Sequence, residues 1–348
     1  MTDEVLFTVN DKGLGVITLN RPKALNSLSL AMVQPLKEKL LRWKNNNHIQ
    51  IILIKGAGEK GLCAGGDIKA LYDARLNEKN KSLAMQFFKE EYELDQLIYD
   101  YPKPIIAYLD GIVMGGGVGL TYGANYRIVT ERTKWAMPEM NIGFFPDVGA
   151  AYFLNKAPGY IGRYLALTAE TIHASDVLYI GGADYFIKSE QFNSLLENLE
   201  NMNWLDVNLD YNLNDFLNQY ANNESGESKL SQLQEEIDLH FSFQTLEEIL
   251  HSLREHPSDF ATTTSDILLS KSPSSLKVTL KQLIDGEEQS LTTCLETDLI
   301  LVRNFLNHSD FYEGVRSVVI DKDRNPQYDF AQLSDFTSQH VEGFFQKK

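Results

Sequence analysis

Short apolar runs with many β-branched residues recur along the first half of the chain, separated by turn residues. Strands are predicted over residues 5–9 and 16–20, and the Asn-Asp-Lys-Gly sequence at residues 10–13 favours a hairpin between them. Further strands are predicted over three later apolar runs, at residues 49–54, 105–109 and 127–130.

Segments with a helical spacing of apolar residues lie between these strands. Residues 29–43 are predicted to form an amphipathic helix, which Pro35 either kinks or starts. One long charged helix is predicted over residues 69–101, with further helices opening at 118–122 and covering 147–155 and 159–167. This alternation of strands and helices predicts an α/β architecture.

The pattern changes near residue 186, where strand signals become rare and Glu, Asn, Leu and Gln dominate. The rest of the chain is predicted to be mainly helical, including residues 295–307 and 310–323, with a flexible polar loop at residues 221–228. We therefore expect an α/β core over residues 1–190, which carries the chemistry, and a mainly helical C-terminal region over residues 191–348.

Composition narrows the classes of protein. With 348 residues, 43% of them hydrophobic and 11% aromatic, the chain can bury a large core, and disorder is disfavoured. A formal net charge of −16 disfavours nucleic acid and anionic lipid as partners, and no apolar run approaches the length of a membrane span. Cys63 and Cys294 form neither a disulfide framework nor a metal-binding pattern, and the acidic first five residues do not resemble a signal peptide. A cytoplasmic location is therefore predicted.

Two glycine-containing turns carry the first chemical signal. The sequences Ala-Gly-Gly-Asp at residues 64–67 and Gly-Ile-Val-Met-Gly-Gly-Gly at residues 111–117 each follow an apolar, strand-like run and precede a helical segment. Such turns leave backbone N–H groups free, and two facing turns can hold one oxygen that becomes negative in a reaction, which is an oxyanion hole. One alternative is close packing of a helix on a sheet. The other is a dinucleotide-binding fingerprint, although Gly123 lies one residue after the position that the third glycine of this fingerprint requires.

Two carboxylates in an apolar stretch are candidates for acid–base chemistry. Glu139 and Asp147 lie among Pro, Met and Phe residues, where desolvation would raise a carboxyl pKa. The alternatives are a surface acid for Glu139 and a helix N-cap for Asp147. Taken alone, Glu91 is typical of a solvated helix face, Asp67 of a helix cap and Cys63 of a small apolar filler. No zinc-binding motif is present, so no metal site is predicted.

Four motifs in order resemble the enoyl-CoA hydratase/isomerase (crotonase) superfamily: Leu-Asn-Arg-Pro-Lys-Ala-Leu-Asn at 19–26, Cys-Ala-Gly-Gly-Asp-Ile at 63–68, the glycine run at 111–117, and Pro-Glu at 138–139. This resemblance implies a ββα superhelical spiral, the crotonase fold, which binds coenzyme A thioesters. It also implies that the N–H groups of Gly66 and Gly116 hold the thioester oxygen. The loop formed by Lys23, Ala24 and Leu25 would lie against the adenosine part of coenzyme A.

The resemblance extends to the 3-hydroxyisobutyryl-CoA hydrolases within this superfamily. Gly119 stands where hydratases carry one of two catalytic glutamates, whereas Asp147 adds an acid where hydratases usually have small residues. Near the C-terminus, residues 310–316 and 320–323 also resemble these hydrolases. The resemblance implies that Asp147 binds the substrate hydroxyl or positions water, and that Glu91 touches the substrate. Further substrate contacts are implied for four residues in or beside the glycine turns: Gly65, Asp67, Ile68 and Gly115.

The leading hypothesis is hydrolysis of a short 3-hydroxyacyl-CoA thioester, with 3-hydroxyisobutyryl-CoA from valine breakdown as the implied substrate. Glu139 would act as a nucleophile or as a general base on water. No cofactor is expected, since coenzyme A is part of the substrate, and the resemblance allows a homo-oligomer. An enoyl-CoA hydratase or isomerase and a non-catalytic acyl-CoA-binding protein stay open as alternatives.

Overall fold

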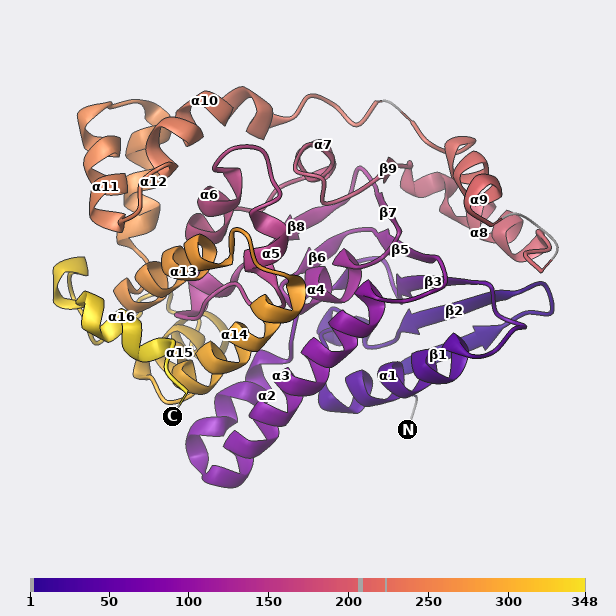
Figure 1. Cartoon of the computed structure of the whole chain (residues 1–348), viewed down its shortest axis with the longest axis horizontal. Helices are drawn as coiled ribbons and strands as arrows, with labels where there is room; N and C mark the ends of the chain where they lie inside the picture. Colours follow the sequence, from indigo (N-terminus) through magenta and orange to yellow (C-terminus); the bar gives the residue numbers. More distant parts are fainter. Residues whose placement is uncertain (1–2, 206–208, 223, 348) are drawn as a thin grey trace. The chain divides into compact units, whose positions relative to one another are not determined.

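The computed structural model describes residues 3–205, 209–222 and 224–347 (Figure 1). The chain forms two compact units. The sheet unit contains Met1–Gly66, Glu90–Trp135 and Ile172–Lys229, and the helical unit contains Asp67–Lys89, Ala136–Thr171 and Leu230–Lys348. The units thus alternate along the chain, and the predicted division at residue 190 stays a prediction. No described helix is both long enough and apolar enough to cross a membrane.

A six-stranded sheet with the order β1-β2-β3-β5-β7-β9 organises the sheet unit (Figure 1). The predicted hairpin is confirmed, because β1 and β2 pair antiparallel, while the later strands pair parallel. The strand bounds are β1 (Val5–Val9), β2 (Leu14–Leu19), β3 (Ile51–Gly56), β5 (Ile105–Leu109), β7 (Tyr126–Val129) and β9 (Tyr185–Phe186). The parallel pairs agree with the predicted α/β architecture, since parallel strands need crossover connections.

A second, three-stranded sheet was not predicted. It has the order β4-β6-β8, with β4 (Gly61–Cys63), β6 (Ile112–Met114) and β8 (Lys134–Ala136). Each strand has three residues, too few for an alternating pattern to show in the sequence. β4 and β6 pair parallel and lead directly into the two glycine turns, so this small sheet aligns the turns with each other.

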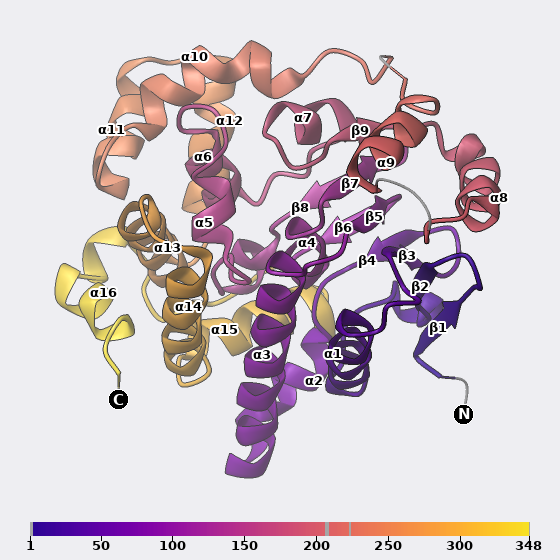
Figure 2. The same cartoon turned by 45° about the vertical axis from the view of Figure 1, so that its right-hand side comes forward.

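The two faces of the six-stranded sheet are covered by different helices of the sheet unit. On one face lie α8 (Phe192–Asn201) and α9 (Leu209–Asn218) (Figure 2). Buried apolar residues of the sheet pack there with both helices and with Trp204. On the other face, α1 (Leu30–Lys44) places Trp43 against Gly15, where a Cβ would lie 2.7 Å from the indole ring. Residues between 187 and 220, which follow the change of pattern near residue 186, therefore complete the core of this sheet.

The single helix predicted over residues 69–101 is wrong. The chain forms α2 (Ile68–Tyr72), a 3-10 turn over Asp73–Leu76, and then α3 (Glu78–Tyr99). Between them Asn77 is extended, and its Oδ1 accepts a hydrogen bond from the Asn80 N–H at 2.9 Å. An asparagine that satisfies the first free N–H groups of a new helix explains the break.

The helical unit is built mostly from the C-terminal part of the chain. In it, α5 (Ala150–Leu154) packs against α13 (Pro273–Gly286) and α14 (Leu291–Phe305). After β9 the described residues form no further strand. The predicted helix over 295–307 is confirmed by α14. The one over 310–323 is confirmed as far as residue 320, by α15 (Ser309–Val315) and a π-helical turn at Arg316–Ile320, and residues 321–323 are not helical. The predicted loop at 221–228 includes residue 223, which lies outside the described residues.

The helices of the two units that have not been given above have the following bounds: α4 (Gly116–Tyr122), α6 (Ile161–Thr168), α7 (Ala174–Tyr179), α10 (Lys229–Phe241), α11 (Leu246–Glu255), α12 (Asp259–Leu269) and α16 (Ser338–Phe344).

Candidate active site

The two glycine turns of the sheet unit face each other. Gly65 (φ +98°) and Gly115 (φ +52°) take backbone angles that favour glycine. A Cβ on Gly65 would lie 3.5 Å from the Gly116 nitrogen, and a Cβ on Gly116 would lie 3.5 Å from the Gly66 nitrogen. Among the described residues, the turn and loop hydrogen bonds use neither the Gly66 nor the Gly116 N–H as a donor. Two amides so placed can donate to one shared oxygen.

Glu91 lies beside Gly116. It comes from α3, only 2% of it is exposed, and its Oε1 contacts the position that a Cβ of Gly116 would occupy. The interpretation of Glu91 as part of a solvated helix face is therefore wrong. Cys63, just before the first turn, is fully buried, and burial raises the pKa of its thiol to about 12. The interpretation of Cys63 as an apolar filler is confirmed, since its thiolate is disfavoured.

The predicted adenosine-binding loop is joined to the first glycine turn. Lys23 and Ala24 are exposed, and the Leu25 carbonyl accepts a hydrogen bond from the Ala64 N–H at 3.1 Å. Buried Asn26 holds the loop closed: its Oδ1 accepts from the Arg21 N–H at 2.9 Å, and its Nδ2 donates to two backbone carbonyls at 3.0 Å. Asn26 is the last residue of the motif at 19–26 and had no predicted role; it positions the loop rather than carrying chemistry.

Glu139 and Asp147 are both buried in the helical unit. Glu139 begins a 3-10 helix, η3 (Glu139–Ile142), and only 8% of it is exposed. Burial raises the pKa of Glu139 well above its usual range, and the charge of Asp147 raises it further. Glu139 Oε2 has no hydrogen-bond partner among the described residues, so a water or a ligand can bind it without breaking an existing bond. A surface position for Glu139 is excluded.

Asp147 is not the N-cap of the following helix. α5 begins at Ala150 rather than at Asp147 as predicted, with Gly149 in the N-cap position and no side-chain capping bond. The helix starts late because Val148 and Gly149 both have positive φ, at +51° and +78°. Asp147 is 5% exposed, and its carboxylate acts on the pKa of Glu139. The helix-cap alternative for Asp147 is therefore wrong.

The other implied contact residues lie at the start of α2. Asp67 occupies the N-cap position of α2, without a side-chain capping bond, and Ile68 is the first helical residue. The candidate residues thus fall into two groups. The amide turns, Glu91 and the adenosine loop belong to the sheet unit, and the two buried carboxylates belong to the helical unit.

A model of the family described as enoyl-CoA hydratase/isomerase matches residues 14–345 of this chain. The chain belongs to the enoyl-CoA hydratase/isomerase family. Among curated relatives, it is 40% identical over 343 residues to "3-hydroxyisobutyryl-CoA hydrolase, mitochondrial" of Danio rerio, covering 98% of this chain and 89% of that protein. It is 38% identical over 335 residues to the Homo sapiens protein of the same name, covering 95% and 86%.

Solved structures of the family have the same fold. The structure of a carnitinyl-CoA dehydratase from Mycobacterium thermoresistibile superposes with a TM-score of 0.92 at 35% identity, covering 100% of this chain and 97% of that one. An enoyl-CoA hydratase from Rhodobacter sphaeroides 2.4.1 superposes with a TM-score of 0.88 at 32% identity, covering 98% and 97%. The predicted crotonase-like fold with a helical C-terminal region is confirmed. In the described residues of this family member, no group of three or more His, Cys, Asp or Glu could hold a metal ion.

The C-terminal motif at 310–316 supports the Glu139 segment in this member of the enoyl-CoA hydratase/isomerase family. α15 packs on η3, and a Cβ on Gly314 would clash with the backbone of Ile142. A Cβ on Gly143, which has a φ of +64°, would clash with the carbonyl oxygen of Asp310. The buried Asp310 carboxylate is in turn held by the hydroxyls of two serines, Ser272 and Ser274, at 2.6 and 2.8 Å.

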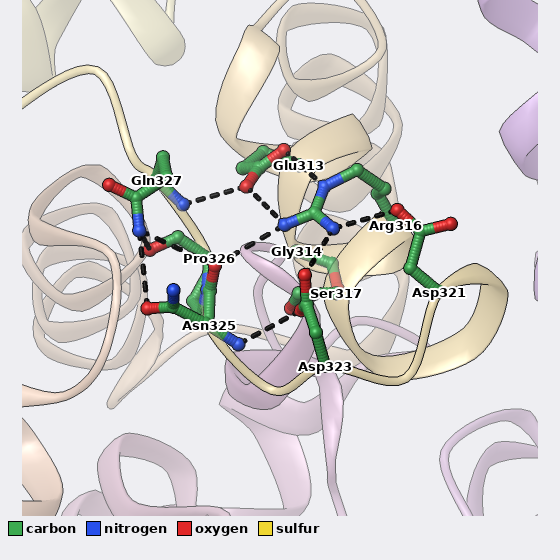
Figure 3. Close-up of polar contacts among 9 residues, drawn as sticks. All are labelled: Glu313, Gly314, Arg316, Ser317, Asp321, Asp323, Asn325, Pro326 and Gln327. Atoms are coloured by element: carbon green, nitrogen blue, oxygen red, sulfur yellow. Dashed lines mark hydrogen bonds and ion pairs between the residues drawn. The ribbon is translucent and has the colours of Figure 1, made fainter.

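The second part of this motif is a partly exposed ion cluster around Arg316, shown in Figure 3. Arg316 donates to Glu313 at 2.8 and 2.9 Å, to Asp321 at 2.8 Å and to Asp323 at 2.6 Å. Glu313 also accepts a hydrogen bond from the Gln327 N–H at 2.7 Å. The cluster fixes the course of the chain after α15, so this part of the motif has a structural role.

Replacing Gly314 by alanine should lower the free energy of unfolding by about 1–3 kcal/mol, since the new methyl group has no room beside Ile142. Turnover should fall as well, because the displaced backbone leads to Glu139. Urea unfolding followed by circular dichroism measures the first effect. Gly343 in α16 is the matched control, because a Cβ there meets nothing within 4 Å. Gly343→Ala should be neutral or slightly stabilising, and equal losses in both variants would contradict the packing argument.

Proposed function

We propose that this protein hydrolyses short 3-hydroxyacyl-CoA thioesters and that 3-hydroxyisobutyryl-CoA is its preferred substrate. The observation that carries the proposal is the pair of buried carboxylates, Glu139 and Asp147, whose charges interact in an apolar segment. The names of relatives about 40% identical over nearly the whole chain support the same activity. Gly119 at the position of a hydratase glutamate favours hydrolysis over addition of water to a double bond.

The proposed reaction needs amide donors for the thioester oxygen and a carboxylate that attacks or activates water. The Gly66 and Gly116 N–H groups polarise the thioester carbonyl and stabilise the tetrahedral oxyanion, where one donor is typically worth about 10²–10³-fold in rate. Glu139 either attacks the carbonyl carbon, forming an anhydride that water opens, or removes a proton from the attacking water. In both routes, water's hydroxyl ends on the acyl group and its proton on the coenzyme A thiolate.

Asp147 is the group we assign to the substrate's 3-hydroxyl. A buried carboxylate accepts a hydrogen bond from a hydroxyl strongly, and a site built for a hydroxyl rejects the analogue that lacks it. Glu91 lies at the Gly116 amide and would contact the acyl end beside the carbonyl. These two carboxylates would therefore select a short, hydroxylated acyl group.

A panel of coenzyme A esters tests this function. Thiol release is measured with 3-hydroxyisobutyryl-CoA, 3-hydroxypropionyl-CoA, and isobutyryl-CoA, which lacks the hydroxyl. We expect kcat/KM to be highest for 3-hydroxyisobutyryl-CoA and lowest for isobutyryl-CoA. Absence of thiol release from all three esters would refute the hydrolase proposal and leave a hydratase or dehydratase, or a non-catalytic acyl-CoA-binding protein.

A hydratase or dehydratase is the second candidate, because the two solved structures at 35% and 32% identity carry the names of such enzymes. The same panel separates the two activities. A dehydratase would convert 3-hydroxyisobutyryl-CoA into a 2,3-unsaturated thioester, whose absorbance rises without release of thiol.

The pH profile should report the raised pKa of Glu139. Because Glu139 must be ionised to act as nucleophile or base, kcat/KM should rise with pH through a midpoint above 4.5, the usual value for a glutamic acid. In Asp147→Asn the like charge is gone, so the midpoint of the residual activity should move to lower pH but stay above 4.5, since burial remains the larger cause. An unshifted midpoint in Asp147→Asn would contradict the charge coupling.

Location and assembly stay predictions. The curated relatives are named as mitochondrial proteins, whereas the two unpaired cysteines of this chain, both buried, suit any reducing compartment. We propose the cytoplasm, which cell fractionation tests. A homo-oligomer is proposed on the basis of the family resemblance, and sedimentation equilibrium measures it.

A further inference from the structure

The turn that carries Asp147 is held from both ends by two polar side chains of the helical unit. Gln282 of α13 donates its Nε2 to the Pro146 carbonyl at 2.9 Å. Asp298 of α14 accepts from the Gly149 N–H through Oδ2 at 2.8 Å. The two side chains are joined to each other, because Gln282 Nε2 also donates to Asp298 Oδ1 at 2.8 Å. These three hydrogen bonds connect the backbone before Asp147 to the backbone after it, through the side chains of Gln282 and Asp298.

The held turn is strained. Val148 has a φ of +51°, in the left-handed region that β-branched residues rarely adopt. Such a conformation persists only where the surroundings fix it, and strained residues of this kind gather at functional sites. The Pro146 carbonyl and the Gly149 N–H flank Val148, so the bonds from Gln282 and Asp298 act where the strain must be held.

An aspartic acid at the buried position 298 lowers the stability of the fold unless its carboxyl group makes a specific contact. Asp298 is fully buried, and Gln282 is 2% exposed. Burial raises the pKa of Asp298 well above its usual range, and the charge of Asp147 adds to this, while the donors from Gly149 and Gln282 act in the opposite direction. Burying a carboxyl group is unfavourable where an apolar residue could simply pack. What Asp298 adds is a fixed acceptor for the turn.

We infer that Asp298 and Gln282 are positioning residues, which hold the Pro146–Gly149 turn so that the Asp147 carboxylate is aimed at the substrate's 3-hydroxyl. The inference rests on the proposed role of Asp147. Neither residue touches substrate in this account. Both act through the backbone on either side of Asp147, so their loss should reduce selectivity for hydroxylated esters rather than hydrolysis in general.

The test compares kcat/KM for 3-hydroxyisobutyryl-CoA with that for isobutyryl-CoA, using the full chain. Asp298→Asn keeps the shape but gives up one of the two acceptors, and Gln282→Leu removes both donated bonds. In each variant we expect the ratio of the two kcat/KM values to fall about 10–100-fold, the scale of a misplaced catalytic group. The value for isobutyryl-CoA should stay nearly unchanged. Circular dichroism and thermal unfolding check that each variant is folded.

Two further variants separate positioning from a structural role. In Asp298→Asn/Gln282→Glu, the asparagine can accept from Gly149 and donate to the new carboxylate, whereas the Pro146 carbonyl loses the amide that donated to it, so only part of the ratio should return. Asp310→Asn, a buried acid elsewhere in the helical unit, should lower both rates by one factor and leave the ratio unchanged. The inference is overturned if the Asp298 and Gln282 variants lower both esters equally. Failure of the proposed function would look different, as no thiol release by the wild-type protein from any ester.

Discussion

Replacing Glu139 by glutamine should reduce thiol release from 3-hydroxyisobutyryl-CoA about 10²–10⁴-fold, the range typical of removing a positioned general base. The amide has nearly the shape of the carboxyl group but can neither attack a thioester nor take up a proton near neutral pH. Affinity for coenzyme A should change little, because the residues assigned to the adenosine part are Lys23, Ala24 and Leu25, which the substitution leaves unchanged.

The same variant should be more stable than the wild-type protein at pH 7–8. The pKa of Glu139 in the folded protein is raised above 4.5, so the folded state binds its proton more tightly than the unfolded state does. That stabilisation is present at low pH and is lost as the pH rises through the folded pKa. Each tenfold difference in proton affinity between the two states is worth about 1.4 kcal/mol. Glutamine carries no charge, so it avoids the loss.

Thermal unfolding of wild type and Glu139→Gln at pH 4 and pH 8 measures this effect. The gain in Tm should be larger at pH 8 than at pH 4. Glu288→Gln, at an exposed position of the same unit, is the control and should shift Tm little at either pH. A Glu139→Gln protein with wild-type turnover would remove Glu139 from the mechanism. One with a lower Tm at pH 8 would contradict the account of its buried charge.

Gly116→Ala should lower kcat about 10²–10³-fold, as loss of one oxyanion donor does. The new methyl group would take the place that Glu91 Oε1 occupies, so either the Gly116 backbone or the Glu91 side chain must move. Movement of the backbone turns the N–H away from the thioester oxygen. Movement of Glu91 disturbs the assigned contact with the acyl end. KM should change less than kcat, because the amides act mainly on charge that develops during the reaction.

Gly116→Ala/Glu91→Ala tests whether the clash is the cause. Removal of the Glu91 carboxylate makes room for the methyl group, so the double variant should have a higher kcat than Gly116→Ala alone. Gly343→Ala again serves as the control, since the added methyl group there meets nothing. Full turnover by Gly116→Ala would show that this amide does not stabilise the oxyanion.

Strand positions were predictable where apolar and β-branched residues form runs of five or six, as in β2, β3 and β5. The three strands of the small sheet were not predictable, because a strand of three residues is too short to show an alternating pattern of apolar and polar positions. The break at Asn77 did have a signal. Asparagine before a helical run often marks the first residue of a helix. Here, however, the charged pattern continues on both sides of Asn77 and favours a single helix.

Burial of the acids was the harder part. Glu90 and Glu91 are neighbours in one helix and look alike in sequence, yet Glu90 forms an ion pair with Lys37 while Glu91 is buried at the amide turn. Only packing between distant segments separates the two. Asp298 and Gln282 gave no signal either, because their partners lie 149 and 136 positions away along the chain. The glycine and Pro-Glu motifs indicated which residues form the candidate site, but not which residues hold them in place.

Incubation with 3-hydroxyisobutyryl-CoA in ¹⁸O-labelled water, followed by mass spectrometry of the products, tests the central claim most directly. Hydrolysis over many turnovers should give free coenzyme A and free 3-hydroxyisobutyrate with one labelled oxygen in its carboxyl group, and Glu139→Gln should give almost none. An acyl group that stayed on coenzyme A, either unchanged or as an unsaturated thioester, would contradict the proposed hydrolysis.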